Sequence, residues 1–147
     1  MEPVVVAATW SVERLREDMR AGLAGQSMEA LNWRPYPEGN TISGLISHMY
    51  ESGNFLLRTG LGQEVVRERD AQFAATMTDA DAVLAHVDRS TENLLGLARS
   101  YTAEDLARQH DFRGLDVVGA WFVLHMCEHL QEHWGQIQTI RDLAANR

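Results

Sequence analysis

Cysteine and lysine are the scarcest residue types in this chain. There is one cysteine, Cys127, and no lysine among the 147 residues. A single cysteine excludes an intramolecular disulfide and every zinc module built on several cysteines. All 13 basic residues are arginines, and they stand against 21 acidic residues, which leaves a formal net charge of −8. We therefore expect no nucleic-acid partner, because binding to phosphates draws on clustered positive charge.

Long hydrophobic runs are absent as well. The longest apolar run, residues 117–124, is far shorter than the roughly 20 residues that a membrane-spanning helix needs. The N-terminal segment has no basic residues, and its apolar stretch is too short for a signal peptide. We expect a cytoplasmic protein with no membrane partner. The length fits one domain, residues 1–147, large enough to bury its own core.

Four segments repeat apolar residues at three- and four-residue steps, which is typical of amphipathic helices, and no segment indicates a strand. They cover approximately residues 9–27, 40–60, 78–98 and 116–144, and a further short turn is expected at 102–106. The connection over residues 60–77 is long enough to run back along a bundle, so that the second and third helices point the same way. The sequence therefore predicts an all-α fold, a four-helix bundle with one long crossover.

The six histidines are the most informative residues. His125, His129 and His133 follow one another at four-residue steps in the last predicted helix. They share one face, with neighbouring Cβ atoms roughly 5–6 Å apart. Two such imidazoles can bind one metal ion, whereas the outer two of the three lie about 12 Å apart along the helix axis. His48, at the edge of the apolar stripe of the second helix, is the best candidate for a third ligand.

One histidine pair from the last helix, joined by His48, would leave an open coordination position for water or a substrate, as in catalytic zinc sites. The alternative is a set of buried histidines that are hydrogen-bonded and bind no metal. His86 and His110 fall outside the apolar stripes, and we expect both at the solvated surface.

We expect neither of two better-known metal motifs here. Residues 129–133 match the His-x-x-Glu-His signature of inverted zincins. A bundle of this size offers no evident peptide cleft, however, so Glu132 is expected to be an ordinary solvated carboxylate. A ferritin-like di-iron site needs Glu-x-x-His pairs on two helices. The nearest spacing here, from His48 to Glu51, runs in the reverse order.

Two stretches of sequence form a recognisable combination. The first is Leu-Asn-Trp-Arg-Pro at 31–35, Gly-Asn-Thr-Ile at 39–42 and Leu-Ile-Ser-His at 45–48. The second is Trp-Phe-Val-Leu-His-Met-Cys-Glu-His at 121–129, Glu-His-Trp-Gly-Gln-Ile at 132–137, and then Arg141. Together they resemble the DinB-like (DinB/YfiT) superfamily of metal-binding four-helix bundles, and the resemblance covers essentially the whole chain.

The resemblance implies an up-down-down-up bundle that binds one divalent ion, nickel or zinc in several relatives. The implied ligands are His48, His129 and His133, since the last of these precedes the Gly-Gln pair. His125 then falls one turn outside the triad and is expected, like Gln136, to be a pocket residue. The sequence departs from the family pattern at Trp134, where many relatives carry a basic residue.

The resemblance also implies a function. Characterised relatives include S-transferases and isomerases that use a low-molecular-weight thiol, and some hydrolases. The reacting group is then a metal-bound water or thiol, and Cys127 is expected to be a small core residue. The implied partners are a small-molecule substrate and a second copy in a homodimer, with a role in the stress response. Two alternatives stay open: a non-catalytic metal- or small-ligand-binding bundle, and a scaffold without metal.

Overall fold

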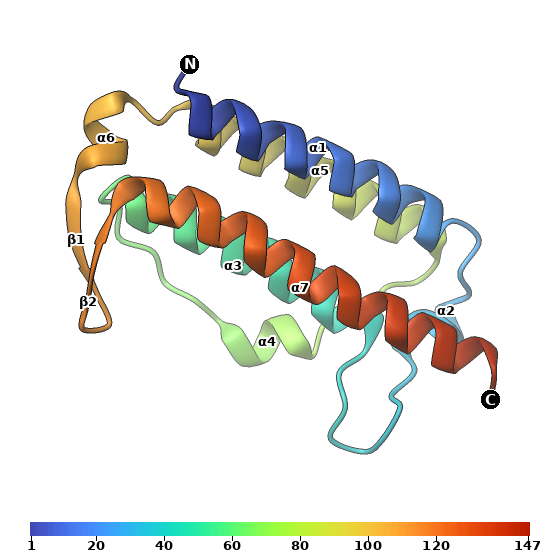
Figure 1. The fold of residues 1–147 in the computed structure, drawn as a ribbon. Helices are drawn as coiled ribbons and strands as arrows, with labels where there is room; N and C mark the ends of the chain where they lie inside the picture. The colour runs from blue at the N-terminus through green and yellow to red at the C-terminus, as the bar shows by residue number, and fades with distance from the viewer.

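The computed structural model describes all residues, 1–147, as a bundle of helices with one small β-hairpin (Figure 1). The long helices are α1 (Pro3–Leu23), α3 (Ile42–Gly60), α5 (Ala80–Arg99) and α7 (Gly119–Ala145). The short helices are α2 (Met28–Asn32), α4 (Arg69–Phe73) and α6 (Ala103–Ala107), and the strands are β1 (Gln109–Phe112) and β2 (Leu115–Val118). Apart from the hairpin, the predicted all-α class is confirmed.

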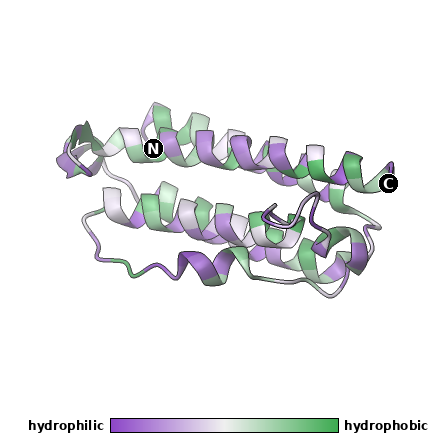
Figure 2. Ribbon diagram, turned by 90° about the horizontal axis from the view of Figure 1, so that it is seen from below, coloured by the Kyte–Doolittle hydropathy of each residue, from purple (hydrophilic) through white to green (hydrophobic).

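The long helices lie side by side and share one core (Figure 1). Helix α3 packs against α7 and α5, and α1 packs against the same two helices from the other side. Fully buried side chains come from all four, among them Met19, Ile46, Leu94 and Phe122. Hydrophilic and hydrophobic residues alternate along each long helix in Figure 2, as expected for helices that bury one side. None of the helices combines the length and the apolar composition that crossing a membrane requires.

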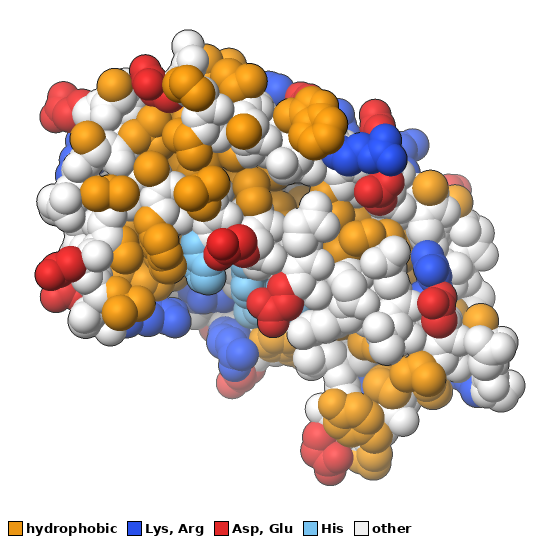
Figure 3. Space-filling view, in the orientation of Figure 1, with side chains coloured by type: hydrophobic (Ala, Val, Ile, Leu, Met, Phe, Trp, Pro, Cys, Tyr) orange, Lys and Arg blue, Asp and Glu red, His pale blue; other side chains and the backbone are white.

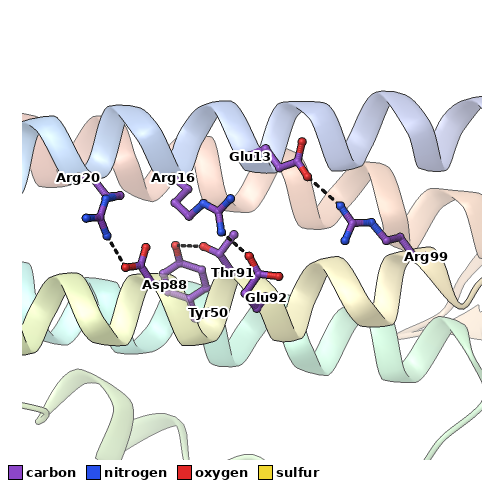
Figure 4. Close-up of polar contacts among 8 residues, drawn as sticks. All are labelled: Glu13, Arg16, Arg20, Tyr50, Asp88, Thr91, Glu92 and Arg99. Carbon is purple, nitrogen blue, oxygen red and sulfur yellow. Dashed lines mark hydrogen bonds and ion pairs between the residues drawn. The ribbon is translucent and has the colours of Figure 1, made fainter.

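Polar contacts close the surface where α1 meets α5 (Figure 4). Three ion pairs bridge the two helices: Arg16–Glu92, Arg20–Asp88 and Arg99–Glu13. Exposed pairs of this kind contribute only about 0–1 kcal/mol each. Beneath them, the hydroxyl groups of Tyr50 and Thr91 lie 2.9 Å apart in the core. This buried hydrogen bond ties α3 to α5 and satisfies two polar groups that would otherwise be costly to bury.

Local capping chemistry sets the helix ends. The Thr41 hydroxyl accepts a hydrogen bond from the backbone N–H of Gly44 at 2.9 Å, and α3 begins and ends where the sequence predicts. Helix α1 is different, because it covers Pro3–Leu23 instead of the predicted 9–27. Proline is well suited to the first turn of a helix, since that turn needs no N–H donor there.

The hairpin contradicts the prediction that the chain has no strand. Its strands have four residues each, too few to show a clear alternation of polar and apolar residues. Arg113 and Gly114 form the turn with φ angles of 57° and 81°, the left-handed conformation that a tight hairpin requires. The Phe112 ring anchors the hairpin on the core, with its centroid 5.2 Å from that of Phe122.

Because β2 of the hairpin extends to Val118, α7 begins at Gly119 and not at the predicted residue 116. Gly119 passes so close to α6 that a Cβ atom there would lie 1.9 Å from the carbonyl oxygen of Asp105. The short turn expected at 102–106 is confirmed as α6, which begins with a capping box between Thr102 and Asp105.

The long connection between α3 and α5, residues 61–79, returns along the outside of α3 (Figure 1). It contains α4, a short helix that the sequence did not predict. Helix α4 reaches α3 at Gly44, where a Cβ atom would lie 2.5 Å from the carbonyl oxygen of Phe73. Only a glycine permits this approach, and it brings α4 to α3 one helical turn before His48.

Candidate metal centre

His48 lies on α3, and its side chain packs against α4. Its side chain is buried, and its ring stacks on that of Phe73 with 4.1 Å between the ring centroids. Its Nδ1 atom lies 3.1 Å from the Oε1 atom of Gln72, the residue before Phe73. Because an amide oxygen can only accept, Nδ1 carries the proton and Nε2 offers its lone pair. The contact of α4 with Gly44 therefore fixes both the position and the tautomer of His48.

His129 and His133 face His48 from α7, the helix that packs against α3. The ring centroid of His48 is 5.3 Å from that of His129 and 4.9 Å from that of His133, and the latter two are 4.3 Å apart. One nitrogen atom from each ring lies within 4.8 Å of the other two. The fold thus brings together the three histidines that the sequence singled out.

His133 is oriented in the same way as His48. Its Nδ1 atom lies 2.8 Å from the Oε1 atom of Gln136, one turn further along α7, so its Nε2 also offers a lone pair. The Nε2 atoms of His129 and His133 are buried and have no hydrogen-bond partner in the protein. Leaving such an atom unpaired costs about 1–3 kcal/mol, and such atoms are rare. A metal ion would satisfy both.

Burial keeps two of the three histidines uncharged. Burial lowers the pKa of His129 to about 3, with a further contribution from repulsion by His133. Burial also lowers the pKa of His48 to about 4, partly opposed by its hydrogen bond to Gln72. Both side chains are therefore neutral at pH 7, which is the form of histidine that binds metal ions.

The cluster fits a divalent transition-metal ion. Neutral imidazole nitrogens suit zinc, nickel, copper and iron. Zinc–nitrogen bonds of about 2.0–2.1 Å place the nitrogen atoms of a tetrahedral site roughly 3.3 Å apart, whereas the three nitrogen atoms here lie within 4.8 Å of one another, so binding an ion would draw the rings together. Three protein ligands leave one position of a tetrahedral ion free. The arrangement is therefore suited to an ion that also binds a small molecule.

A cavity of about 90 Å³ opens beside His129, and His125 lies on its wall. His125 stacks on Trp121 with 4.4 Å between the ring centroids, and its Nδ1 atom lies 3.2 Å from a carboxylate oxygen of Glu128. Figure 3 shows histidine side chains inside a recess on this face, with arginine side chains along its lower edge. His125 thus lies beside the cluster and outside it.

Gln136 occupies the other side of the cluster. Besides accepting from His133, it lines a larger groove of about 530 Å³ between α7 and the loop before α3. None of the three clustered histidines lines that groove, so the smaller cavity beside His129 is the one relevant to their chemistry.

Three residues around the cluster were not predicted from the sequence. Gln72 orients His48, the Ser52 hydroxyl lies 3.5 Å from the Nε2 atom of His48, and Arg67 donates a hydrogen bond to Ser52. Ser52 follows His48 by four residues on the same helix, so the spacing could have revealed it. Gln72 and Arg67 lie in the connection between α3 and α5, where no periodicity indicates a direction.

Several other candidates lie away from the chemistry. Cys127 is half-buried with Sγ 3.8 Å from the carbonyl oxygen of Ala8, and burial followed by the Glu128 charge raises its pKa to about 11. Glu51 and Glu132 are exposed, and neither forms a hydrogen bond to the cluster.

The two remaining histidines need a correction. His86 and His110 were expected at the solvated surface, but both are half-buried. The His86 ring lies 6.0 Å from that of Tyr50, and the His110 ring lies 5.1 Å from that of Phe122. Both therefore pack against aromatic side chains of the core.

The family of the protein follows from a comparison of its sequence with known families. Residues 11–137 match the DinB superfamily. The protein belongs to the DinB superfamily. The resemblance noted in the sequence is thereby confirmed. No protein of curated function matches the chain.

Solved structures of similar fold include three bacterial proteins. A conserved protein from Enterococcus faecalis matches with a TM-score of 0.80 and 13% identity, and all of both chains is covered. A DinB-like protein from Bacillus cereus matches with a TM-score of 0.69 and 18% identity, covering 89% of this chain and 86% of that one. A DinB-like protein from Bacillus subtilis has the same TM-score at 19% identity, covering 95% and 90%. At these identities the likeness establishes the fold alone.

Proposed function

We propose that this DinB-superfamily protein is a divalent-metal-dependent enzyme, with nickel or zinc as the ion. His48, His129 and His133 would be the ligands. The observation that carries the proposal is the pair of buried Nε2 atoms on His129 and His133 that have no partner in the protein. Without an ion, the fold would have buried two ring nitrogen atoms beside a third imidazole and left both without a partner.

The chain's own residues would prepare the site. Gln72 and Gln136 hold the rings of His48 and His133 by their Nδ1 protons, as partners outside the ligand sphere do in other metal sites. Burial keeps His48 and His129 neutral and ready to bind. A bound ion lowers the pKa of a water or thiol at its open position. We propose thiol S-transfer or a related transfer or hydrolysis as the reaction.

An assay of thiol transfer tests this proposal. Protein loaded with one equivalent of Zn²⁺ or Ni²⁺ would be mixed with a small thiol and an aromatic halide, and the thioether product measured. Product should form faster than with metal-free protein, and a His133→Ala variant should lose the difference. A His86→Gln variant, altered on α5 away from the cluster, should keep it. Equal rates with and without metal for every thiol tested would contradict the enzymatic role.

A non-catalytic metal-binding bundle is the second candidate function. The small volume of the cavity beside His129, about 90 Å³, favours it, because little room is left for two reactants. In that case the ion should raise the stability of the protein, by mass action, while no thiol or electrophile is consumed. The transfer assay and a metal titration of the melting temperature together separate the two candidates.

We also propose the assembly and helix order that the family resemblance implies. A homodimer is supported by exposed apolar side chains on the N-terminal part of α1, including Val6 and Trp10. Sedimentation of the wild type and a Trp10→Glu variant would test it, with the variant expected to be monomeric. The up-down-down-up order is supported by the return of residues 61–79 along α3 (Figure 1). A role in the stress response stays a prediction.

A further inference from the structure

Two arginines meet at the cavity beside His129 without an acidic partner. Arg67 comes from the connection between α3 and α4, and Arg113 comes from the tip of the hairpin. Among the ion pairs of the chain, none involves either residue. No carboxylate lines the cavity. In a protein with a net charge of −8, this is a local concentration of uncompensated positive charge.

Arg67 is held in place by groups that leave its charge unbalanced. It donates to the Ser52 hydroxyl, and its guanidinium carbon lies 4.8 Å from the centroid of the Phe55 ring. Its Nε–H is buried and has no partner. Burial lowers the pKa of Arg67, and repulsion by Arg113 adds to the effect. The guanidinium group therefore has one side-chain acceptor, the Ser52 hydroxyl, and no carboxylate partner in the chain.

Arg113 occupies a backbone position that is unfavourable for it. Its φ of 57° is the only positive φ among the non-glycine residues. Asparagine, aspartate or glycine is the usual choice in such a turn, because a longer side chain is unfavourable in the left-handed conformation. Backbone strain of this kind is concentrated at functional positions. The side chain leans over the Phe112 ring, 5.0 Å from its centroid, and so is directed to the cavity by a residue anchored in the core.

Carboxylates are present nearby but do not neutralise the pair. Glu51 acts on Arg67 only through space, as a minor influence that raises its pKa. Glu128 is exposed and is engaged with Nδ1 of His125. A small anion from solution is therefore the natural partner of Arg67 and Arg113.

We propose that the cavity binds the carboxylate group of a small molecule whose other end reaches the open side of His129. This inference rests on the proposed metal site, because it assigns the compound that would occupy the open position. A guanidinium group can bind a carboxylate through two parallel hydrogen bonds, and the Arg67 side chain lines the cavity with a single hydrogen bond of its own, to Ser52. The volume of about 90 Å³ accommodates a compact group of this size.

Three thiols that share the chain HS–CH2–CH2 test the inference, because they differ only in the group at the far end, which is a carboxylate, a hydroxyl or an ammonium group. They are 3-mercaptopropionate, which is negative, 2-mercaptoethanol, which is neutral, and cysteamine, which is positive. Binding to Co²⁺-loaded protein would be followed by the charge-transfer absorption of a cobalt–thiolate bond. The negative thiol should bind at least about tenfold more tightly than the neutral one, since the paired charges form strong hydrogen bonds, and cysteamine should bind most weakly.

The variants decide whether these arginines are responsible. Arg67→Gln should abolish the preference for 3-mercaptopropionate, Arg113→Gln should reduce it, and Arg67→Lys should keep part of it through its charge. Arg89→Gln, on the exposed side of α5, serves as the matched control and should retain the full preference. Equal affinities for the three thiols in the wild type would overturn the inference while leaving the metal site intact.

A second experiment tests the anion site independently of the metal site. If the protein binds no cobalt, the proposed function fails, and propionate would be titrated into the metal-free protein by calorimetry. Saturable binding that is lost in Arg67→Gln would still support an anion site. No binding of propionate, or tighter binding of inorganic phosphate than of propionate, would overturn the assignment of a carboxylate.

Discussion

The Nδ1 atom of His48 lies 3.1 Å from the Oε1 atom of Gln72, which stands 24 positions later in the sequence. This contact joins the core of the bundle to the connection between α3 and α5. It fixes the ring of His48 so that Nε2 carries a lone pair, which the Ser52 hydroxyl approaches to 3.5 Å. The candidate metal centre therefore depends on α4 as well as on the long helices.

Replacing Gln72 should weaken metal binding without abolishing it. In Gln72→Ala the His48 ring loses the acceptor that fixes its orientation and tautomer. Loss of such a partner typically lowers metal affinity about 10–100-fold. Competition with a chelator of known affinity measures the change. Gln131→Ala, at an exposed position of α7, is the matched control and should bind like the wild type. Unchanged affinity in Gln72→Ala would show that α4 does not support the site.

Gly44 should be sensitive to a single methyl group. In Gly44→Ala the new Cβ would lie 2.5 Å from the carbonyl oxygen of Phe73, so α4 must move away from α3. We expect about 1–3 kcal/mol of lost stability, together with weaker metal binding because Gln72 moves with α4. Urea unfolding and the chelator competition measure the two effects.

Gly96 provides the opposite control. No atom lies within 4 Å of a Cβ atom built there, and the residue is exposed in the middle of α5. Gly96→Ala should stabilise the protein by about 0.5–1 kcal/mol, since alanine loses less conformational freedom than glycine in a helix. If Gly44→Ala and Gly96→Ala changed the stability in the same direction, this would contradict the close contact of α4 with α3 at Gly44.

The stability of the metal-free protein should fall with acidity through the histidine cluster. The folded-state pKa of His48, about 4, lies below its ordinary value of 6.5, so the unfolded chain binds more protons between these values. Its contribution is thus present above pH 6.5 and is lost as the pH falls toward 4. From pH 7 to pH 5, His48 alone should reduce the free energy of unfolding by about 2 kcal/mol. Urea unfolding of the wild type and His48→Gln, with chelator present, measures the difference, and parallel pH curves would refute it.

Cys127 should be a poor nucleophile. Burial raises its pKa to about 11, so less than one thiol in a thousand is ionised at pH 7. A disulfide reagent such as dithionitrobenzoate should modify the folded protein far more slowly than the urea-unfolded chain. Cys127→Ser should keep the metal and any thiol-transfer activity. Rapid modification of the folded protein, or loss of transfer in Cys127→Ser, would assign the thiol a role that the fold does not support.

The sequence predicted the four long helices and the histidine cluster better than the segments that connect the helices. Helical periodicity located the four long helices, and the four-residue step between His129 and His133 placed both on the face that meets α3. Spacing alone could not separate a metal site from a hydrogen-bonded cluster. That distinction depends on the two unpartnered Nε2 atoms, which only the packed structure reveals.

The missed features share one physical cause. Arg67 and Gln72 lie in segments whose path is set by tertiary contacts, such as the approach of α4 to Gly44. Arg113 sits in a hairpin too short for its strands to show a pattern. Where a side chain points from such a segment depends on what the segment packs against, and a linear sequence does not contain that information.

Elemental analysis shows whether the three histidines hold a metal ion. Protein purified without a metal-affinity column or chelator would be analysed as the wild type and as His48→Ala, His129→Ala, His133→Ala and His125→Ala. We expect about one divalent ion per chain in the wild type and in His125→Ala, and none in the other three. A wild type that holds no ion, even after incubation with nickel and zinc, would contradict this expectation.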